Sequence, residues 1–192
     1  MQPQLILASA SPRRKQLLAQ IGIDCLVHAM DIDETPLANE HPLAYVQRMA
    51  AEKSAAGLAR LASPLPILAA DTSVVLGDVI LGKPDNADHA VAMLRQLSGR
   101  SHQVYTAVSL RSAQQHGQAV SITEVCFREL SEQEIHAYCQ TDEPHDKAGS
   151  YALQGKASVF VKSLSGSVSG VIGLPLFETA QLLSAQGINV FP

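Results

Sequence analysis

The sequence predicts an α/β fold with one mixed, twisted sheet. Short apolar runs with the length of strands alternate with longer segments in which apolar residues recur every three or four positions, the period of a helix. Turn residues alone separate two pairs of the strand-like runs, which indicates hairpins and therefore antiparallel pairing beside parallel pairing. Because no repeat, linker or low-complexity tail interrupts the chain, we expect residues 1–192 to form a single domain.

The chain begins with a predicted strand, helix and second strand. The apolar run at 4–8 predicts a buried strand, and Ser11 followed by Pro12 has the residue types that begin a helix. This helix carries its apolar residues on one face and ends at Gly22. A further apolar run at 25–29 predicts the second strand.

A long helix and a strand with a polar centre come next. After an acidic, proline-containing loop at 31–36, the apolar spacing predicts a helix over 43–61. The following apolar runs predict strands at 66–70, 74–76 and 79–81. The polar residues Asp71-Thr72-Ser73 separate the first two runs, and Gly77-Asp78 is a tight-turn signal before the third.

The remainder of the chain adds three helices and a long hairpin. We expect the helices at 85–98, from Ser131 onward, and at 176–185. Glu134 follows Ser131 by three residues, the pattern of a capping box. We expect strands at 104–110, 120–127 and 157–164, the first two joined as a hairpin across 114–117. The Gly/Ser-rich segment 166–170 is interpreted as a flexible hairpin, with a mobile lid as the alternative.

Composition excludes several classes of function. A net charge of −4 argues against a broad surface for nucleic acid or an anionic membrane, and 4% aromatic residues argue against a base-stacking platform. The longest uncharged stretch, 163–177, is too short and too broken by Gly, Ser and Pro to span a membrane. The N-terminal run lacks the charge order of a signal peptide, and the three cysteines form no C-x-x-C pair. We therefore expect a cytoplasmic protein with reduced thiols.

The turn at 9–14 has the composition of an anion-binding site. A helix N-terminus offers free N–H groups and a partial positive charge. Ser9 and Ser11 add hydroxyl donors, and the guanidinium groups of Arg13 and Arg14 suit phosphate oxygens. The alternative is an ordinary helix cap followed by surface arginines.

Asp71, next to an apolar run, is the candidate for acid–base or metal chemistry. A carboxylate at the carboxyl end of a buried strand lies where open α/β sheets bind ligands, and it could hold Mg²⁺ or take a proton from water. The alternative is a carboxylate that caps a turn. The dispersed charges Glu34, Lys53, Lys83 and Lys147 are each typical of solvated surface, but together they supply the cations and oxygen ligands that a metal-bound polyphosphate needs.

Six blocks of the sequence resemble, in chain order, the signature motifs of the Maf family of nucleoside triphosphate pyrophosphatases. They are LASASPRR at 7–14, ADT at 70–72, GKP at 82–84, YTAV at 105–108, DKAGSYALQG at 146–155 and VIGLP at 171–175. The resemblance implies two lobes around a deep cleft, similar to the inosine triphosphate pyrophosphatases. It also implies cleavage of a nucleoside triphosphate into monophosphate and pyrophosphate, with Mg²⁺ or Mn²⁺ as the divalent metal.

The resemblance assigns a role to each candidate residue. Asp71 is the expected catalytic base and, with Glu34, a metal ligand. The expected phosphate-binding residues are Ser9, Arg13, Arg14, Lys53 and Lys83. The specificity positions Arg13, Thr72 and Gln154 match the branch of the family that acts on dTTP and UTP. CTP and modified pyrimidine nucleotides are further candidate substrates.

Several alternatives stay open at this point. The chain could be a non-catalytic nucleotide sensor that regulates cell division, a 7-methyl-GTP pyrophosphatase of the sister branch, or a generic phosphatase. Val168 departs from the family pattern, which has an aromatic residue at this position. The resemblance is compatible with a homodimer, and with roles in cleansing the nucleotide pool or arresting division.

Overall fold

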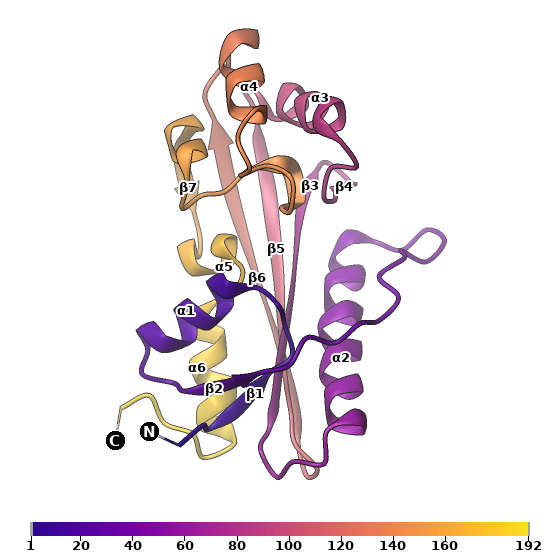
Figure 1. Cartoon of the computed structure of the whole chain (residues 1–192), viewed down its shortest axis with the longest axis vertical. Coiled ribbons are helices and arrows are strands. Elements are labelled where there is room, and N and C mark those ends of the chain that lie inside the picture. The colour runs from indigo at the N-terminus through magenta and orange to yellow at the C-terminus, as the bar shows by residue number, and fades with distance from the viewer. Residues whose placement is uncertain (1, 192) are drawn as a thin grey trace.

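A computed structural model of the chain describes residues 2–191 and places seven strands in one mixed sheet (Figure 1). The sheet order is β2-β1-β3-β5-β6-β7, and β4 pairs with β3 off this path. The strands are β1 (Leu5–Leu7), β2 (Cys25–Val27), β3 (Ile67–Leu76), β4 (Val79–Leu81), β5 (Ser101–Arg111), β6 (His116–Phe127) and β7 (Val161–Ser165). The α-helices are α1 (Pro12–Gln20), α2 (Pro42–Arg60), α3 (Ala87–Leu97), α4 (Glu132–Cys139), α5 (Val168–Ile172) and α6 (Leu176–Ala185). The predicted α/β class with a mixed sheet is confirmed.

The first strand lies between two parallel neighbours. β1 is completely buried, and it pairs with β2 on one side and with β3 on the other. Parallel strands buried on both faces read as continuous apolar runs, which is why this strand was recognisable in the sequence. Helix α1 begins at Pro12 as expected, but the Ser11 side chain makes no capping hydrogen bond. The Ser11 N–H instead donates to Ser9 Oγ at 3.2 Å.

The hairpin of β5 and β6 is longer than the sequence predicted. Its register pairs Ser101 with Cys126 at one end and Arg111 with His116 at the other. The connecting loop is therefore 112–115 instead of 114–117. Residues 116–119 of β6 are His, Gly, Gln and Ala, which carry no apolar alternation, so the sequence gives no strand signal there although the ladder continues to His116.

The predicted break in the third strand is wrong. Asp71, Thr72 and Ser73 lie inside β3, where they pair with Ala107, Thr106 and Tyr105 of β5. The ladder with β5 supplies the backbone hydrogen bonds, so polar side chains do not end the strand. On the other edge of β3, pairing with β1 ends at Leu68 and pairing with β4 begins at Val74. Among residues 2–191, no strand covers that edge in between.

Two predictions near the C-terminus also need correction. Residues Lys156–Phe160 form a 3-10 helix, η2, so β7 begins only at Val161. The Gly/Ser-rich segment is not a hairpin, because Val168–Ile172 forms the short helix α5. Ser167 caps this helix by accepting a hydrogen bond from the Gly170 N–H at 2.9 Å. Serine at an N-cap gives the same composition as a flexible turn, which explains the error.

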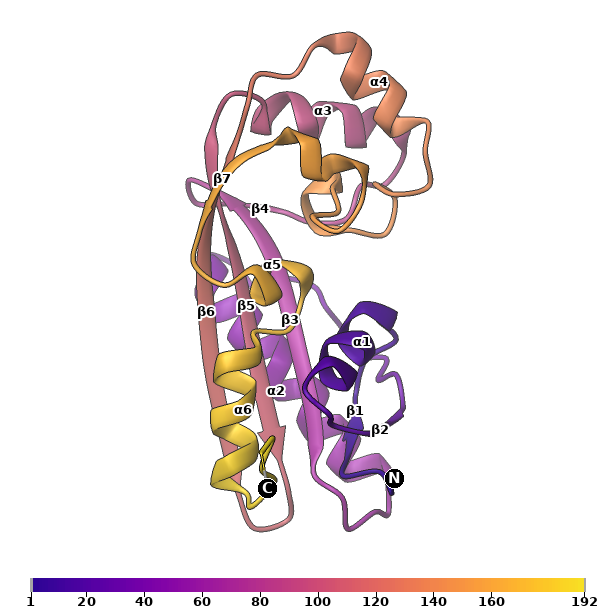
Figure 2. The ribbon, with the colours of Figure 1, turned by 90° about the vertical axis from the view of Figure 1, so that its left-hand side faces the viewer.

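Helices cover both faces of the sheet (Figure 2). Helix α2 packs Val46 and Ala50 against one face. Helices α1 and α6 share a core cluster on the opposite face, and α3 and α4 bury a second cluster at the far end of the same long strands. The molecule therefore has two lobes joined by continuous strands. No helix within residues 2–191 is both long enough and apolar enough to cross a membrane.

Candidate active site

A cleft of about 570 Å³ opens beside the uncovered edge of β3, and its lining comes from both lobes. Every residue predicted for the site lines this cleft: Ser9, Arg13, Arg14, Glu34, Lys53, Asp71, Thr72, Lys83 and Gln154. The fold thus brings together polar and charged residues that are scattered over 146 positions of sequence, from 9 to 154. Asp71 itself lies in the middle of a ten-residue strand, not at a strand end as expected from the sequence.

Asp71 and Thr72 belong to different walls of the cleft. Successive side chains of a strand point to opposite faces of the sheet. Asp71 projects toward α2, where Lys53 meets it, and Thr72 projects toward α1, where Arg14 meets it. Because no neighbouring strand covers this edge of β3, the cleft has access to both side chains.

On the α2 wall, one lysine joins two carboxylates. The Lys53 ammonium lies 2.7 Å from Asp71 Oδ1 and 2.7 Å from Glu34 Oε1. Lys53 and Asp71 are both buried, with 8% and 7% of their surface exposed, whereas Glu34 is more open. Partial burial opposes ionisation of Glu34, but the hydrogen bond and charge of Lys53, together with the charges of Lys83 and Arg14, outweigh it and lower the pKa of this carboxyl group. Both carboxylates therefore face the cleft with a cation between them.

On the α1 wall, Arg14 is held by three acceptors. Its Nε donates to the Gly173 carbonyl at 2.7 Å, Nη1 donates to Ser9 Oγ at 3.0 Å, and Nη2 donates to Thr72 Oγ1 at 3.3 Å. Burial lowers the pKa of Arg14, and the charge of Asp71 acts in the opposite direction. Ser9 and Thr72 thus orient a guanidinium group toward the cleft.

Three of the predicted residues keep their side chains free. Within residues 2–191, no hydrogen bond or ion pair engages the side chains of Arg13, Lys83 or Gln154, although all three line the cleft. Lys147 also lines it, and its ammonium is 2.5 Å from Asp146 Oδ1. Free donors at the rim are available to a ligand without breaking an existing contact.

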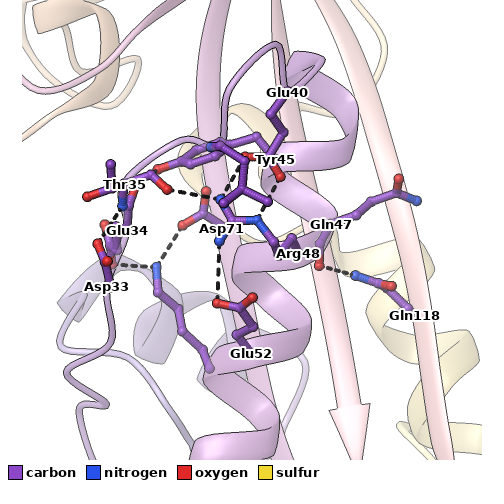
Figure 3. Close-up of polar contacts among 12 residues, drawn as sticks. Asp33, Glu34, Thr35, Glu40, Tyr45, Gln47, Arg48, Glu52, Asp71 and Gln118 are labelled. Carbon is purple, nitrogen blue, oxygen red and sulfur yellow. Dashed lines mark hydrogen bonds and ion pairs between the residues drawn. The ribbon is translucent and has the colours of Figure 1, made fainter.

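Sequence reasoning missed the residues that support this site. Tyr45 of α2 lines the cleft, and its hydroxyl donates to the Glu34 carbonyl at 2.9 Å (Figure 3). Burial, followed by the charges of Asp71 and Glu34, raises the pKa of Tyr45 to about 12. The spacing of Tyr45 and Lys53, eight residues on one helix, was a signal that both share a face. Nothing in the sequence pointed to the Gly173 carbonyl as a partner of Arg14.

The acidic groups offer few ligands for a metal. Asp71 and Glu34 are the two carboxylates of the cleft that share Lys53. Within residues 2–191, no group of three or more His, Cys, Asp or Glu side chains is placed to hold a metal ion. A cation held by these two carboxylates would need further oxygen ligands. Mg²⁺ is commonly bound in this way, through one or two carboxylates together with substrate phosphates.

Known proteins similar to this chain include three bacterial enzymes. The chain is 52% identical to dTTP/UTP pyrophosphatase of Nitrosomonas europaea over 97% of this chain and 96% of the relative. It is 50% identical to dTTP/UTP pyrophosphatase of Methylococcus capsulatus (97% and 92% covered). It is also 50% identical to that of Xanthomonas euvesicatoria pv. vesicatoria (96% and 100% covered).

The similarity to solved structures is more distant. A HAM1 protein from Coxiella burnetii matches with a TM-score of 0.47 and 16% identity over 66% of this chain and 73% of that one. A dITP/XTP pyrophosphatase from Mycobacterium abscessus matches with a TM-score of 0.44 and 15% identity over 64% and 72%. These scores are too low to support an argument.

The sequence match that identifies the family extends over nearly the whole chain. The family model of the Maf-like protein matches residues 4–186, which include every residue of the cleft described above. Together with relatives at about half identity over almost their full length, this match leads to one conclusion: the chain belongs to the Maf family.

Proposed function

We propose that this protein hydrolyses dTTP and UTP to the nucleoside monophosphate and pyrophosphate. One observation carries the proposal: a single cleft gathers Asp71, a carboxylate partner and five cationic side chains around it. The cationic side chains are Arg13, Arg14, Lys53, Lys83 and Lys147. Relatives that match over nearly their full length are named dTTP/UTP pyrophosphatases, which supports the same assignment.

The cations suit a triphosphate. Arg13 and Lys83 have free donors, and Arg14 is already oriented by Ser9 and Thr72. Prepositioned cations stabilise charge on transferring phosphoryl groups without reorganisation at the moment of reaction. We expect Ser9, Arg13, Arg14, Lys53 and Lys83 to bind the phosphate chain.

The donor set fits a divalent cation that arrives with the nucleotide. Glu34 and Asp71 would hold Mg²⁺ or Mn²⁺ on the protein side, and phosphate oxygens would complete its ligands. When bound, the metal supplies neutralisation of charge on the phosphate oxygens. Lys53 keeps both carboxylates oriented toward the same point, because each lies 2.7 Å from its ammonium.

Asp71 is the proposed general base. Its carboxylate takes a proton from a water molecule as the water oxygen attacks the α-phosphorus. The bond from the α-phosphorus to the bridging oxygen breaks, and that oxygen leaves with pyrophosphate. The ladder between β3 and β5 fixes the backbone of Asp71, and Lys53 fixes its side chain.

Base selection is assigned to Gln154, Arg13 and Thr72. The Gln154 amide both donates and accepts, which suits the imide edge of uracil or thymine. Thr72 acts through Arg14, because its hydroxyl oxygen accepts the Arg14 Nη2 hydrogen bond. A site with such groups discriminates against bases that leave them unpaired, so CTP, whose base lacks the imide edge, is a weaker candidate than dTTP and UTP. Modified pyrimidine nucleotides that keep the imide edge stay candidate substrates.

The test measures pyrophosphate and orthophosphate released from dTTP, UTP, CTP, GTP and 7-methyl-GTP, with Mg²⁺, with Mn²⁺ and with EDTA. We expect pyrophosphate from dTTP and UTP, lost in EDTA, and a fall of about 10²–10⁴-fold in kcat for Asp71→Asn. Orthophosphate as the product would indicate a phosphatase. Preference for 7-methyl-GTP would place the protein in the sister branch, and nucleotide binding without turnover would support a sensor.

A further inference from the structure

We propose that Arg48 and Tyr45 are positioning residues that hold Glu34 in its metal-binding place. Both come from α2, and both bind the backbone of the segment 28–41, which connects β2 to α2 without forming a helix or strand. The inference rests on the proposed function, because it assigns a purpose to contacts around Glu34. Neither residue was a candidate on sequence grounds.

Arg48 binds a carboxylate and the loop backbone at the same time. Its Nε lies 2.7 Å from Glu40 Oε1, and its Nη2 lies 2.6 Å from Glu40 Oε2, a two-point pair (Figure 3). The same Nη2 donates to the Thr35 carbonyl at 3.1 Å, and Nη1 reaches Glu52 Oε2 at 3.4 Å. Only a planar guanidinium group offers donors in this arrangement.

Glu40 is itself tied into the loop. Its Oε2 accepts a hydrogen bond from the Leu37 N–H at 3.0 Å, and 7% of its side chain is exposed. The hydrogen bond from Arg48 lowers the pKa of Glu40 to about 2, so this carboxylate is ionised at neutral pH. The pair therefore closes the end of the loop against α2.

Tyr45 adds a second anchor one residue away. Its hydroxyl donates to the Glu34 carbonyl at 2.9 Å, next to the Thr35 carbonyl that Arg48 holds. The Arg48 guanidinium carbon lies 5.7 Å from the centre of the Tyr45 ring, so the two side chains also pack on each other. Two consecutive carbonyls of the loop are thus fixed by two neighbouring side chains of one helix.

This arrangement sets the position of the Glu34 side chain. With its carbonyl held by Tyr45, Glu34 extends its carboxylate to Lys53 and faces Asp71 across that ammonium. A metal-binding residue on an irregular loop, such as Glu34, loses conformational freedom when it binds the metal. Contacts that already hold the loop before the metal binds reduce that loss. Removing a residue that supports a metal ligand through a hydrogen bond typically lowers metal affinity or activity 10- to 100-fold.

The main variant is Arg48→Lys, because lysine keeps the charge but cannot bind both Glu40 oxygens and the Thr35 carbonyl together. We expect the Mn²⁺ concentration for half-maximal dTTP hydrolysis to rise about tenfold. At saturating Mn²⁺, kcat should stay within about twofold of the unaltered protein, since Arg48 does not line the cleft. Tyr45→Phe, which loses one hydrogen bond, should raise the same concentration about two- to tenfold.

The matched control is Arg95→Lys. Arg95 forms a two-point pair of the same geometry with Glu132, at 2.8 Å from Nε to Oε1, but this pair is more exposed and lies on the other lobe, outside the cleft. A purely structural effect of losing an arginine–glutamate pair would appear in both lysine variants. An effect on metal binding is expected in Arg48→Lys and Tyr45→Phe only.

A second readout does not depend on turnover. Titration of Mn²⁺, followed by the electron paramagnetic resonance signal of the free ion, measures metal binding in the presence of a non-hydrolysable dTTP analogue. We expect weaker Mn²⁺ binding in Arg48→Lys and Tyr45→Phe, and unchanged binding in Arg95→Lys. If Arg48→Lys and Tyr45→Phe both bind Mn²⁺ like the control, the positioning role is wrong. If the unaltered protein binds Mn²⁺ but releases no pyrophosphate, the proposed function fails while the positioning role is still measured.

Discussion

Asp71 and Thr72 are adjacent in the sequence, yet each contributes to a different wall of the cleft. This division follows from strand geometry, which sends neighbouring side chains to opposite faces. Asp71 meets Lys53 and Thr72 meets Arg14, so one dipeptide links a carboxylate pair to a guanidinium group. The strand ladder with β5 fixes the spacing of both walls.

At this scale, Lys53→Met tests how strongly the carboxylates depend on their shared cation. Removing one partner of a buried ion pair leaves an uncompensated charge, so we expect the free energy of unfolding to fall by about 3 kcal/mol. The double variant Lys53→Met with Asp71→Asn should recover at least about 1 kcal/mol, because one of the unpaired charges is then gone. Urea unfolding measures both. The exposed Lys162→Met is the control, with an expected change within about 0.5 kcal/mol.

A double variant that is simply additive would show that Lys53 and Asp71 do not depend on each other.

Residues of the cleft could be predicted because they lie in motifs of distinctive chemistry. Arg48 and Tyr45 could not, since their partners are the carbonyls of Thr35 and Glu34. A backbone carbonyl has no sequence signature, and which one a side chain meets depends on the tertiary path of the loop.

Among the elements, β3 shows why sequence patterns misplace boundaries. Its polar centre resembles a loop, but every residue from Ile67 to Val75 is paired with a residue of β5 in the antiparallel ladder. Strand propensity depends on the neighbouring strand more than on the residue itself. Helices with long apolar stripes, such as α3, were predicted nearly to the residue, because their period is carried by their own sequence. The short helix α5 has too few turns for such a period.

The segments that carry Lys83 and Lys147 approach each other closely at Gly149. This residue has φ +66°, its N–H donates to the Gly82 carbonyl at 3.0 Å, and an added Cβ would lie 2.9 Å from both Val74 methyl carbons. For Gly149→Ala we expect the free energy of unfolding to fall by about 2–4 kcal/mol, from overpacking together with backbone strain.

Gly22→Ala is the matched control for this change. Gly22 has a similar φ of +75°, but an added Cβ meets no atom within 4 Å. We therefore expect its free energy of unfolding to fall only by the cost of backbone strain, about 1 kcal/mol. Chemical unfolding of the two variants separates strain from packing. Equal losses would mean that Val74 moves aside without cost.

Across the whole molecule, the two lobes share the same strands. Val74 and Val104 belong to the core beneath α3, and Leu68 and Val108 belong to the core beneath α1 and α6, although each pair comes from β3 and β5. If one lobe unfolded, β3 and β5 would be disordered over part of their length. The paired strands that form the core of the other lobe would then lose support.

We therefore expect one cooperative unfolding transition. Far-ultraviolet circular dichroism follows all elements, and tyrosine fluorescence is usable because the chain has no tryptophan. Tyr138 and Tyr151 are buried in the lobe of α3 and α4, whereas Tyr45 and Tyr105 pack with α2. The double variant Tyr45→Phe with Tyr105→Phe therefore leaves a tyrosine signal that reports on the lobe of α3 and α4. Coincident midpoints in urea would support the prediction, and an earlier fluorescence transition would show that this lobe unfolds on its own.

Lys53 also provides the cleft with an internal counter-ion. Because its ammonium lies between the carboxylates of Asp71 and Glu34, it reduces the electrostatic repulsion between these two negative charges. A divalent cation that arrives with a nucleotide would take over these carboxylates, and the Lys53 ammonium would then be available to the phosphate oxygens. The two ion pairs of Lys53 therefore keep both carboxylates in place before a metal ion binds.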